Sequence, residues 1–183
     1  AGPAPLKYLG LGDLTVLICF GPGMIAYSSS LLVGTVPLAA VVLALPAALY
    51  VVAILHANNY RDIESDKQGG ARTVAVHLGP QNSIVYYKIL LASAHIVAML
   101  AGWFYGCYGC LATIWVLPQS IWLCIRIHNP ATLRDQDEET AKTMMMFSVA
   151  NALGLITMPG AEISALPMGI CALVVGVLKV FAD

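Results

Sequence analysis

The sequence predicts an all-α membrane protein, a multi-helix transmembrane bundle of about six spans. Of its 183 residues, 59% are hydrophobic and only 10% are charged, whereas soluble domains average about 25% charged residues. A helix needs about 20 mostly apolar residues to cross a bilayer. Six stretches of the sequence meet this requirement: 14–33, 36–57, 82–105, 110–127, 142–160 and 163–181.

The boundaries of these stretches suit membrane spans. The first two are separated by a short loop free of Lys and Arg, and the second ends in a dense polar run. The third and fourth end near Trp103, Tyr105 and Trp122, aromatic residues typical of the membrane interface. The last two are separated only by Pro159-Gly160-Ala161-Glu162, so they could instead form one broken helix and a surface segment.

The positions of the basic residues support this count, because each span carries the chain to the opposite side of the membrane. With six spans, all 9 Lys and Arg residues fall on or near one face. The opposite loops, near 34–36, 106–109 and 160–163, carry none. By the positive-inside rule the basic face is cytoplasmic. The formal net charge of −1 implies no nucleic-acid partner.

Two further features bear on the protein class. The chain begins Ala1-Gly2-Pro3-Ala4-Pro5, without Met or a basic n-region, so the first span is not expected to be a signal peptide. The 5 cysteines lie mostly inside spans, which argues against a disulfide scaffold. Cys107 and Cys110 lie in a non-cytoplasmic turn, where they could form a disulfide or serve as small packing residues.

A dense polar run, His56-Ala-Asn-Asn-Tyr-Arg-Asp-Ile-Glu-Ser-Asp66, follows the second stretch. If the helix continues past Asn58, then Asn58, Asp62 and Asp66 are spaced one turn apart and share a face bordered by Asn59. Carboxylates one turn apart repel each other, and a bound Mg²⁺ would relieve the repulsion while bridging to substrate phosphates. The alternative is a solvated loop of mixed charge.

Basic residues surround this run. Arg61, Lys67 and Arg72 offer donors suited to phosphate oxygens. Gly69-Gly70 allows a sharp turn that could fold them back over a metal. A second acidic run, residues 135–139, lies on the same face, and we expect it to be a solvated loop.

Two motifs resemble those of a known family. Residues 58–67, NNYRDIESDK, followed by GGARTVAVHLG at 69–79, are similar to the second aspartate-rich motif of the UbiA superfamily of intramembrane prenyltransferases. The form N-N-x-R-D-x-x-x-D resembles the menaquinone branch of this superfamily in particular. The residues LGLGDL at 9–14 and FGP at 20–22 are similar to two further motifs of that branch.

The resemblance implies a Mg²⁺-dependent enzyme embedded in the lipid bilayer. Such an enzyme ionises an isoprenyl diphosphate and alkylates an aromatic quinone precursor of the naphthoquinone type, as in menaquinone or vitamin K biosynthesis. Carried over by position, Asp62 and Asp66 are the expected catalytic residues and metal ligands. The expected substrate-binding residues are Asn58, Asn59, Arg61, Lys67, Arg72 and Asp13.

The sequence departs from the family in one respect. The family carries an earlier motif of the N-D-x-x-D type, and no such motif precedes Asp13. We therefore expect residues 1–183 to be one transmembrane helical domain, the C-terminal portion of a larger UbiA-type fold. The alternative is a shortened, non-catalytic paralogue or a quinone- or lipid-binding interaction protein. Resemblance to animal members favours a eukaryotic internal membrane (endoplasmic reticulum, Golgi or mitochondrion) over a bacterial plasma membrane.

Three polar residues within the spans have open roles, because burying polar groups in lipid is costly and is often functional. His95 could bind haem or a quinone ring, although a hydrogen bond to a neighbouring helix is the preferred interpretation. His56 could face the active chamber or mark the interface. Asp13 could favour the start of its helix electrostatically or bind part of the acceptor.

Overall fold

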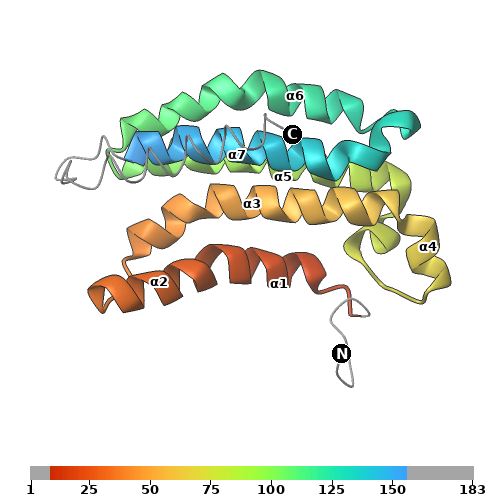
Figure 1. The fold of residues 1–183 in the computed structure, drawn as a ribbon, viewed down its shortest axis with the longest axis horizontal. Coiled ribbons are helices and arrows are strands. Elements are labelled where there is room, and N and C mark those ends of the chain that lie inside the picture. Colours follow the sequence, from red (N-terminus) through yellow and green to blue (C-terminus); the bar gives the residue numbers. More distant parts are fainter. Residues whose placement is uncertain (1–8, 156–183) are drawn as a thin grey trace, which may run out of the picture.

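The computed structural model describes residues 9–155, which form helices and short connections without any strand. Long helices lie side by side and alternate in direction (Figure 1). Within this part, four helical segments are long and apolar enough to cross a membrane: Gly12–Val33, Leu38–Arg61, Val74–Phe104 and Tyr108–Arg126. These correspond to the first four predicted spans, and they make the chain an integral, multi-pass membrane protein. The sixth predicted span, 163–181, lies outside the described residues.

The first span is one helix with a widened turn in its middle. It consists of α1 (Gly12–Ile18), a π-helical segment (Cys19–Gly23) and α2 (Met24–Val33). The widened turn accommodates Pro22, whose nitrogen carries no hydrogen for a helical bond. It also brings Gly21 against α3, where an added Cβ would lie 3.0 Å from the Cβ of Ala48.

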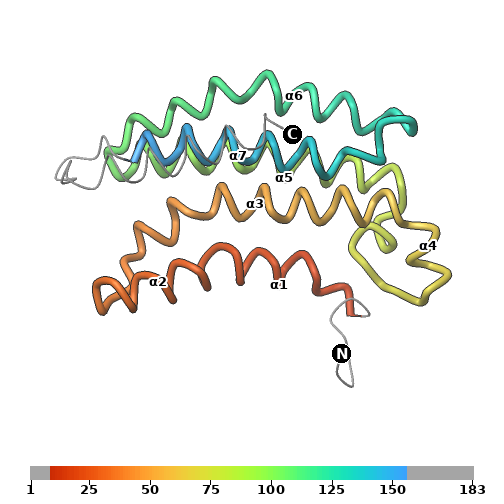
Figure 2. The backbone as a smooth tube through the Cα atoms, viewed as in Figure 1, coloured from red at the N-terminus to blue at the C-terminus, as the bar shows by residue number. Residues whose placement is uncertain are grey.

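Helix α3 (Leu38–Arg61) lies at the centre of the bundle and packs against α1, α5 and α7. Its buried positions include small residues such as Ala48, Ala53 and Ala57, which let neighbouring backbones approach closely. The backbone trace bends in the first third of α3, where Pro46 removes one helical hydrogen bond (Figure 2). The predicted second span is therefore confirmed, with its end extended to Arg61.

Helix α5 (Val74–Phe104) begins earlier than the predicted start at residue 82. Thr73 caps it, because the Thr73 hydroxyl oxygen accepts a hydrogen bond of 3.3 Å from the Val76 amide. The helix is broken at Gly79, which has φ 72° and ψ 173°. Residues before a proline avoid the helical region, and glycine readily takes a positive φ, so Gly79-Pro80 produces this break.

The fourth span and the helix after it differ from expectation. Residues Tyr108–Val116 form a 3₁₀ helix, and the α-helix α6 (Leu117–Arg126) begins only where Pro118 favours a first turn. A second 3₁₀ segment (Pro130–Asp135) leads into α7 (Gln136–Leu155). Of the acidic run expected in a solvated loop, Asp135 ends this 3₁₀ segment, and Asp137, Glu138 and Glu139 lie in the first turn of α7. Helix α7 covers the described part of the predicted span 142–160, but it is not among the four that qualify as spans.

A buried hydrogen-bond network joins three helices at mid-depth. The Tyr50 hydroxyl lies 2.6 Å from Ser120 Oγ and 3.2 Å from His95 Nε2, and Ser120 Oγ lies 2.9 Å from the same nitrogen. All three residues are buried. His95 therefore bonds to neighbouring helices, as its preferred interpretation predicted.

Replacing Tyr50 by phenylalanine is expected to destabilise the bundle by about 1 kcal/mol, because two buried hydrogen bonds are lost while the ring is kept. Thermal unfolding of the detergent-purified protein measures this loss. Tyr27→Phe is the matched control, since Tyr27 is 71% exposed. Equal melting temperatures for Tyr50→Phe and Tyr27→Phe would contradict a stabilising role for the network.

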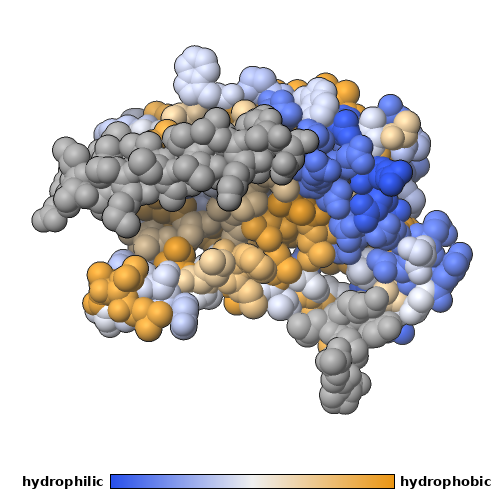
Figure 3. Space-filling model, in the orientation of Figure 1, coloured by the Kyte–Doolittle hydropathy of each residue, from blue (hydrophilic) through white to orange (hydrophobic). Residues whose placement is uncertain are grey.

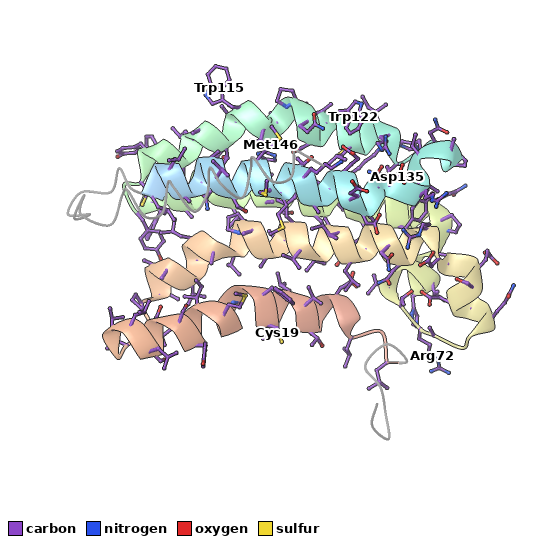
Figure 4. The ribbon with its side chains drawn as sticks, in the orientation of Figure 1. Cys19, Arg72, Trp115, Trp122, Asp135 and Met146 are labelled. Atoms are coloured by element: carbon purple, nitrogen blue, oxygen red, sulfur yellow. The ribbon has the colours of Figure 1, made fainter. Side chains whose placement is uncertain are left out.

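Apolar residues dominate the outer surface, as expected for contact with lipid. Leu32 and Trp115 are each 83% exposed and Phe104 is 80% exposed. Figure 4 shows Trp115 projecting away from the bundle. Cys107 and Cys110 are buried free thiols, and burial raises the pKa of the Cys107 thiol, so they suit packing in this turn.

Candidate functional site

Polar groups gather at one end of the bundle, where α3 ends, α4 (Ile63–Gln68) follows and α7 begins. Figure 3 shows hydrophilic surface concentrated at this end, with apolar surface along the middle of the same face. Arg72 and Asp135, which come from different connections, both lie there (Figure 4). The predicted clustering of charged residues on one face is therefore present in three dimensions.

The centre of this polar end is Arg61. Its Nε lies 3.0 Å from Asp62 Oδ1, and its Nη2 lies 3.2 Å from Asp62 Oδ2. Nη2 also donates to the side-chain oxygen of Asn58. The side-chain oxygens of Asn58 and Asp62 therefore both bind the Arg61 guanidinium.

Asp66 lies one turn beyond Asp62, although the helix does not run through unbroken as predicted. Helix α3 ends at Arg61, and Asp62 has φ −99° and ψ 13° at the junction with α4. The Asp66 amide still donates to the Asp62 carbonyl at 2.8 Å, so the spacing of one turn is retained. The break accompanies the burial of Ile63, which is 4% exposed.

Helix α7 also contributes to the site, through Asp137. Arg61 Nη1 lies 3.3 Å from Asp137 Oδ2 and 3.2 Å from the carbonyl oxygen of Arg134. Arg61 therefore ties the end of α3 to the start of α7. Asp137 was expected in a solvated loop, and its position on the basic face was the one feature of the sequence that pointed to this contact.

Two other predicted substrate-binding residues, Lys67 and Arg72, are more exposed to solvent than the contacts around Arg61. Lys67 pairs with Glu64 at 3.3 Å on the exposed side of α4. Arg72 is exposed and follows the turn at Gly70, whose φ of 72° confirms the predicted sharp reversal of the chain. Among the described residues, no ion pair links either cation to Asp62 or Asp66.

Asp13 and His56 form a separate buried pair beside this polar end. Asp13 Oδ2 lies 3.5 Å from His56 Nδ1, and both side chains are almost fully buried. His56 Nε2 lies 3.1 Å from the carbonyl oxygen of Ser83. The Tyr86 ring packs edge-on against His56 with 4.7 Å between centroids. His56 therefore faces inward rather than marking the interface.

A small cavity of about 90 Å³ opens beside this pair. Its polar lining comes from Asp13, Asn59 and Thr73, and its apolar lining from Leu55 and Val74. Asn59, predicted to border the metal-binding stripe, thus faces the Asp13 cavity, while Asn58 faces Arg61. These neighbouring asparagines therefore lie between the Asp13–His56 pair and the Arg61–Asp62 pair.

A larger apolar groove of about 480 Å³ lies between α2, α3 and α7, toward the opposite end of the bundle. Leu43 on its wall precedes Asn58 by about 22 Å along α3, at 1.5 Å per residue. Its lining is almost entirely apolar, apart from Ser148 and Asn151. A polar end and an apolar groove in one bundle suit amphiphilic ligands.

The sequence matches the UbiA prenyltransferase family over residues 3–151. The chain belongs to the UbiA prenyltransferase family. Its relatives include proteins named UbiA prenyltransferase domain-containing protein 1. The protein from Danio rerio is 47% identical over 90 residues, which is 49% of this chain and 27% of the relative. The protein from Dictyostelium discoideum is 34% identical over 85% of this chain and 47% of the relative.

A third relative, from Ailuropoda melanoleuca, is 31% identical over 90% of this chain and 48% of its own length. The matches to the Ailuropoda and Dictyostelium proteins cover most of this chain but only about half of each relative. The chain therefore spans about half the length of these relatives. Membership of the UbiA prenyltransferase family makes the chain a relative of enzymes that transfer prenyl groups, and the polar end holds the aspartates of the family-like motif.

The donors at the polar end of this UbiA-family chain suit Mg²⁺. Mg²⁺ prefers oxygen ligands and typically takes one or two carboxylates together with substrate phosphates and waters. Asp62 and Asp66 supply two carboxylates, and Asn58 supplies an amide oxygen beside them. Within residues 9–155, no three His, Cys, Asp or Glu side chains converge into a metal site. An ion held by Asp62 and Asp66 would complete its coordination with phosphate oxygens and waters.

Proposed function

We propose that this protein takes part in Mg²⁺-dependent transfer of an isoprenyl group from a polyprenyl diphosphate to an aromatic acceptor of the naphthoquinone type. Such a reaction belongs to the biosynthesis of menaquinone, vitamin K or a related quinone. The observation that carries the proposal is the pair Asp62 and Asp66, one turn apart at the polar end of a bundle that also holds an apolar groove. Membership of the UbiA family supports it.

Each predicted residue has a role in this proposal. Asp62 and Asp66 hold the metal, which when bound neutralises charge on the leaving diphosphate. Arg61 donates to the side-chain oxygens of both Asp62 and Asn58, and it can turn from them toward the diphosphate, while Asn58 is assigned to substrate binding. Lys67, Arg72 and Asn59 are assigned to substrate binding at the rim, and Asp13 is assigned to the aromatic acceptor.

The reaction balances without any oxidant. The allylic C–O bond breaks and its electron pair leaves with the diphosphate. A ring carbon of the acceptor then forms the new C–C bond and loses its proton. The apolar groove between α2, α3 and α7 can hold the apolar end of the prenyl tail away from water.

We place the protein in a membrane with the Asp62–Asp66 end on the cytoplasmic side, because Arg61, Lys67 and Arg72 gather there. A eukaryotic internal membrane is favoured, since the relatives above come from animals and an amoeba. We further propose that residues 1–183 form one helical domain, corresponding to the C-terminal portion of a larger UbiA-type fold.

A non-catalytic function is the second candidate. The sequence holds one aspartate-rich motif where the family uses two, and a quinone- or lipid-binding protein would need only the groove and its polar end. Transfer assays on membranes that contain the longest reading frame including this chain separate the two candidates. Transfer from geranylgeranyl diphosphate to a naphthoquinol, lost on addition of EDTA, supports the enzyme.

Asp137→Asn is expected to raise the Mg²⁺ concentration needed for half-maximal transfer by up to about fivefold. Without the Asp137 carboxylate, Arg61 pairs more fully with Asp62 and competes with the metal for its oxygens. Titration of Mg²⁺ in the transfer assay measures the shift. Asp135→Asn is the control, because the Asp135 side chain is 58% exposed and its nearest basic partner, Arg126, is 4.0 Å away. A lower Mg²⁺ requirement in Asp137→Asn would refute this competition.

A further inference from the structure

Lys88, on helix α5, carries a charge that no carboxylate of the described residues neutralises. Its Nζ lies 2.8 Å from Nε2 of His128, which follows the end of α6. Lys67 and Lys142, by contrast, each pair with glutamate. The Lys88 charge is therefore open to an anion from outside the described part of the chain.

Lys88 and His128 together present hydrogen-bond donors without matching acceptors. An ammonium group only donates, so His128 Nε2 must accept the hydrogen bond of 2.8 Å from Lys88. His128 is then neutral, and its own proton lies on Nδ1. Two ammonium hydrogens of Lys88 and the Nδ1 hydrogen of His128 therefore have no acceptor among the described residues. Such a set of donors suits a group with several charged oxygens, such as a phosphate.

The pair lies where helix α6 leaves the bilayer at the polar end of the bundle. Helix α6 ends at Arg126, two residues before His128. Trp122, one turn before that end, is exposed, and the Arg126 guanidinium lies 5.1 Å from the centre of its ring. Figure 4 shows Trp122 toward the polar end. Tryptophan and long basic side chains gather at the level of lipid headgroups, so Lys88 reaches the depth of the lipid phosphates.

Exposed apolar side chains extend from the pair toward the middle of the membrane. On α6, Ile121 and Ile125 precede His128 by seven and three positions, so all three share one side of the helix. On α5, which packs against α6, Ile89 and Ile96 face outward. All four isoleucines are more than half exposed. A ligand that fits this surface joins an anion to apolar chains, which describes a phospholipid better than free phosphate.

We propose that Lys88 and His128 bind the phosphate of an anionic membrane phospholipid, whose acyl chains lie along α5 and α6. The phosphate accepts hydrogen bonds from the Lys88 ammonium and from His128 Nδ1, and it thereby joins α5 to the end of α6. Basic sites between transmembrane helices on the cytoplasmic side bind lipid headgroups in this way. Asp62 and Asp66 belong to the junction of α3 with α4, so the inference does not depend on prenyl transfer.

The affinities of two lipids test the site. The longest reading frame containing this chain is purified in neutral detergent, and native mass spectrometry measures its binding of dioleoylphosphatidylglycerol and dioleoylphosphatidylcholine. The two lipids share the phosphate and the acyl chains, but choline cancels the phosphate charge. We expect phosphatidylglycerol to bind about fivefold more tightly, the effect of one lysine charge at an anionic membrane surface. Equal affinities in the wild type would overturn the inference.

Substitution of Lys88 provides the second arm. Lys88→Gln is expected to abolish the preference for phosphatidylglycerol, and Lys88→Arg, which keeps the charge, is expected to retain it. Lys142→Gln is the matched control, because it makes the same change in net charge at a lysine that two glutamates already neutralise at 2.9 Å and 3.1 Å. A preference that survives Lys88→Gln, or that Lys142→Gln reduces equally, would remove the assignment.

Two further measurements use the wild type alone, so they remain decisive if Lys88→Gln does not fold. Acylation of the Lys88 amine, followed by mass spectrometry, is expected to be several-fold slower with phosphatidylglycerol than with phosphatidylcholine, and equal rates would contradict the site. Millimolar inorganic phosphate is expected to leave the lipid bound. Displacement by phosphate would mean a site for free phosphate and would refute the lipid. No prenyl transfer is measured, so either proposal can fail without the other.

Discussion

Asp62→Asn is expected to lower the rate of prenyl transfer by at least about a hundredfold, and Asp66→Asn to do the same. Asparagine keeps the size of the side chain and one acceptor oxygen, but it removes the negative charge that a Mg²⁺ site needs. The assay is Mg²⁺-dependent transfer from geranylgeranyl diphosphate to a naphthoquinol in membranes containing the longest reading frame. The alanine substitutions should be equally inactive.

Glu64→Gln is the matched control for these two variants. It makes the same chemical change within the same motif, but Glu64 points to solvent and pairs with Lys67. It is expected to retain most of the wild-type rate. Wild-type transfer by Asp62→Asn would remove the metal role of Asp62, and absence of transfer by the wild type would favour the non-catalytic candidate.

The second large effect is expected at Gly154, where α7 meets the 3₁₀ segment Tyr108–Val116. A Cβ at Gly154 would lie far inside van der Waals contact with the backbone of Gly109 and Cys110. Backbone atoms cannot move aside as a side chain can, so Gly154→Ala must push the two segments apart. We expect a loss of about 1–3 kcal/mol of stability, seen as a melting temperature lower by several degrees in detergent.

Gly12→Ala is the control for Gly154→Ala. Nothing lies within 4 Å of a Cβ added at Gly12, and its φ is not positive. Alanine there is expected to leave the melting temperature unchanged or raise it slightly, because alanine favours helices more than glycine does. A similar melting temperature for both variants would mean that α7 and the 3₁₀ segment do not touch as described.

The sequence predicts the spans well because hydropathy is a local property of each segment. Four of the six predicted spans are present with shifted ends, and the shifts have local causes. The Thr73 cap starts α5 early, and Pro118 delays α6. The spacing of Asp62 and Asp66 was also predictable, since one backbone hydrogen bond keeps them a turn apart even where the helix breaks.

Contacts between distant segments could not be predicted in this way. Asp137 follows Arg61 by 76 positions, and only the packing of α7 on α3 brings them together. Asp13 and His56 were each noticed as polar residues near a span, but their pairing depends on how α1 lies against α3. A pattern within one helix carries no information about which face of another helix it meets.

The widened turn at Cys19–Gly23 changes the directions in which the side chains of the first span point. A π turn accommodates one more residue than an α turn, so every side chain after it is rotated by about 100° about the axis. Side chains in the half that follows Gly23 therefore point about 100° away from the directions they would have if the helix of Asp13 continued without the π turn. Deleting one residue between them would restore an ordinary helix but turn α2 away from α3. The extra residue therefore lets α1 turn Asp13 toward its cavity while α2 turns a different side toward the apolar groove.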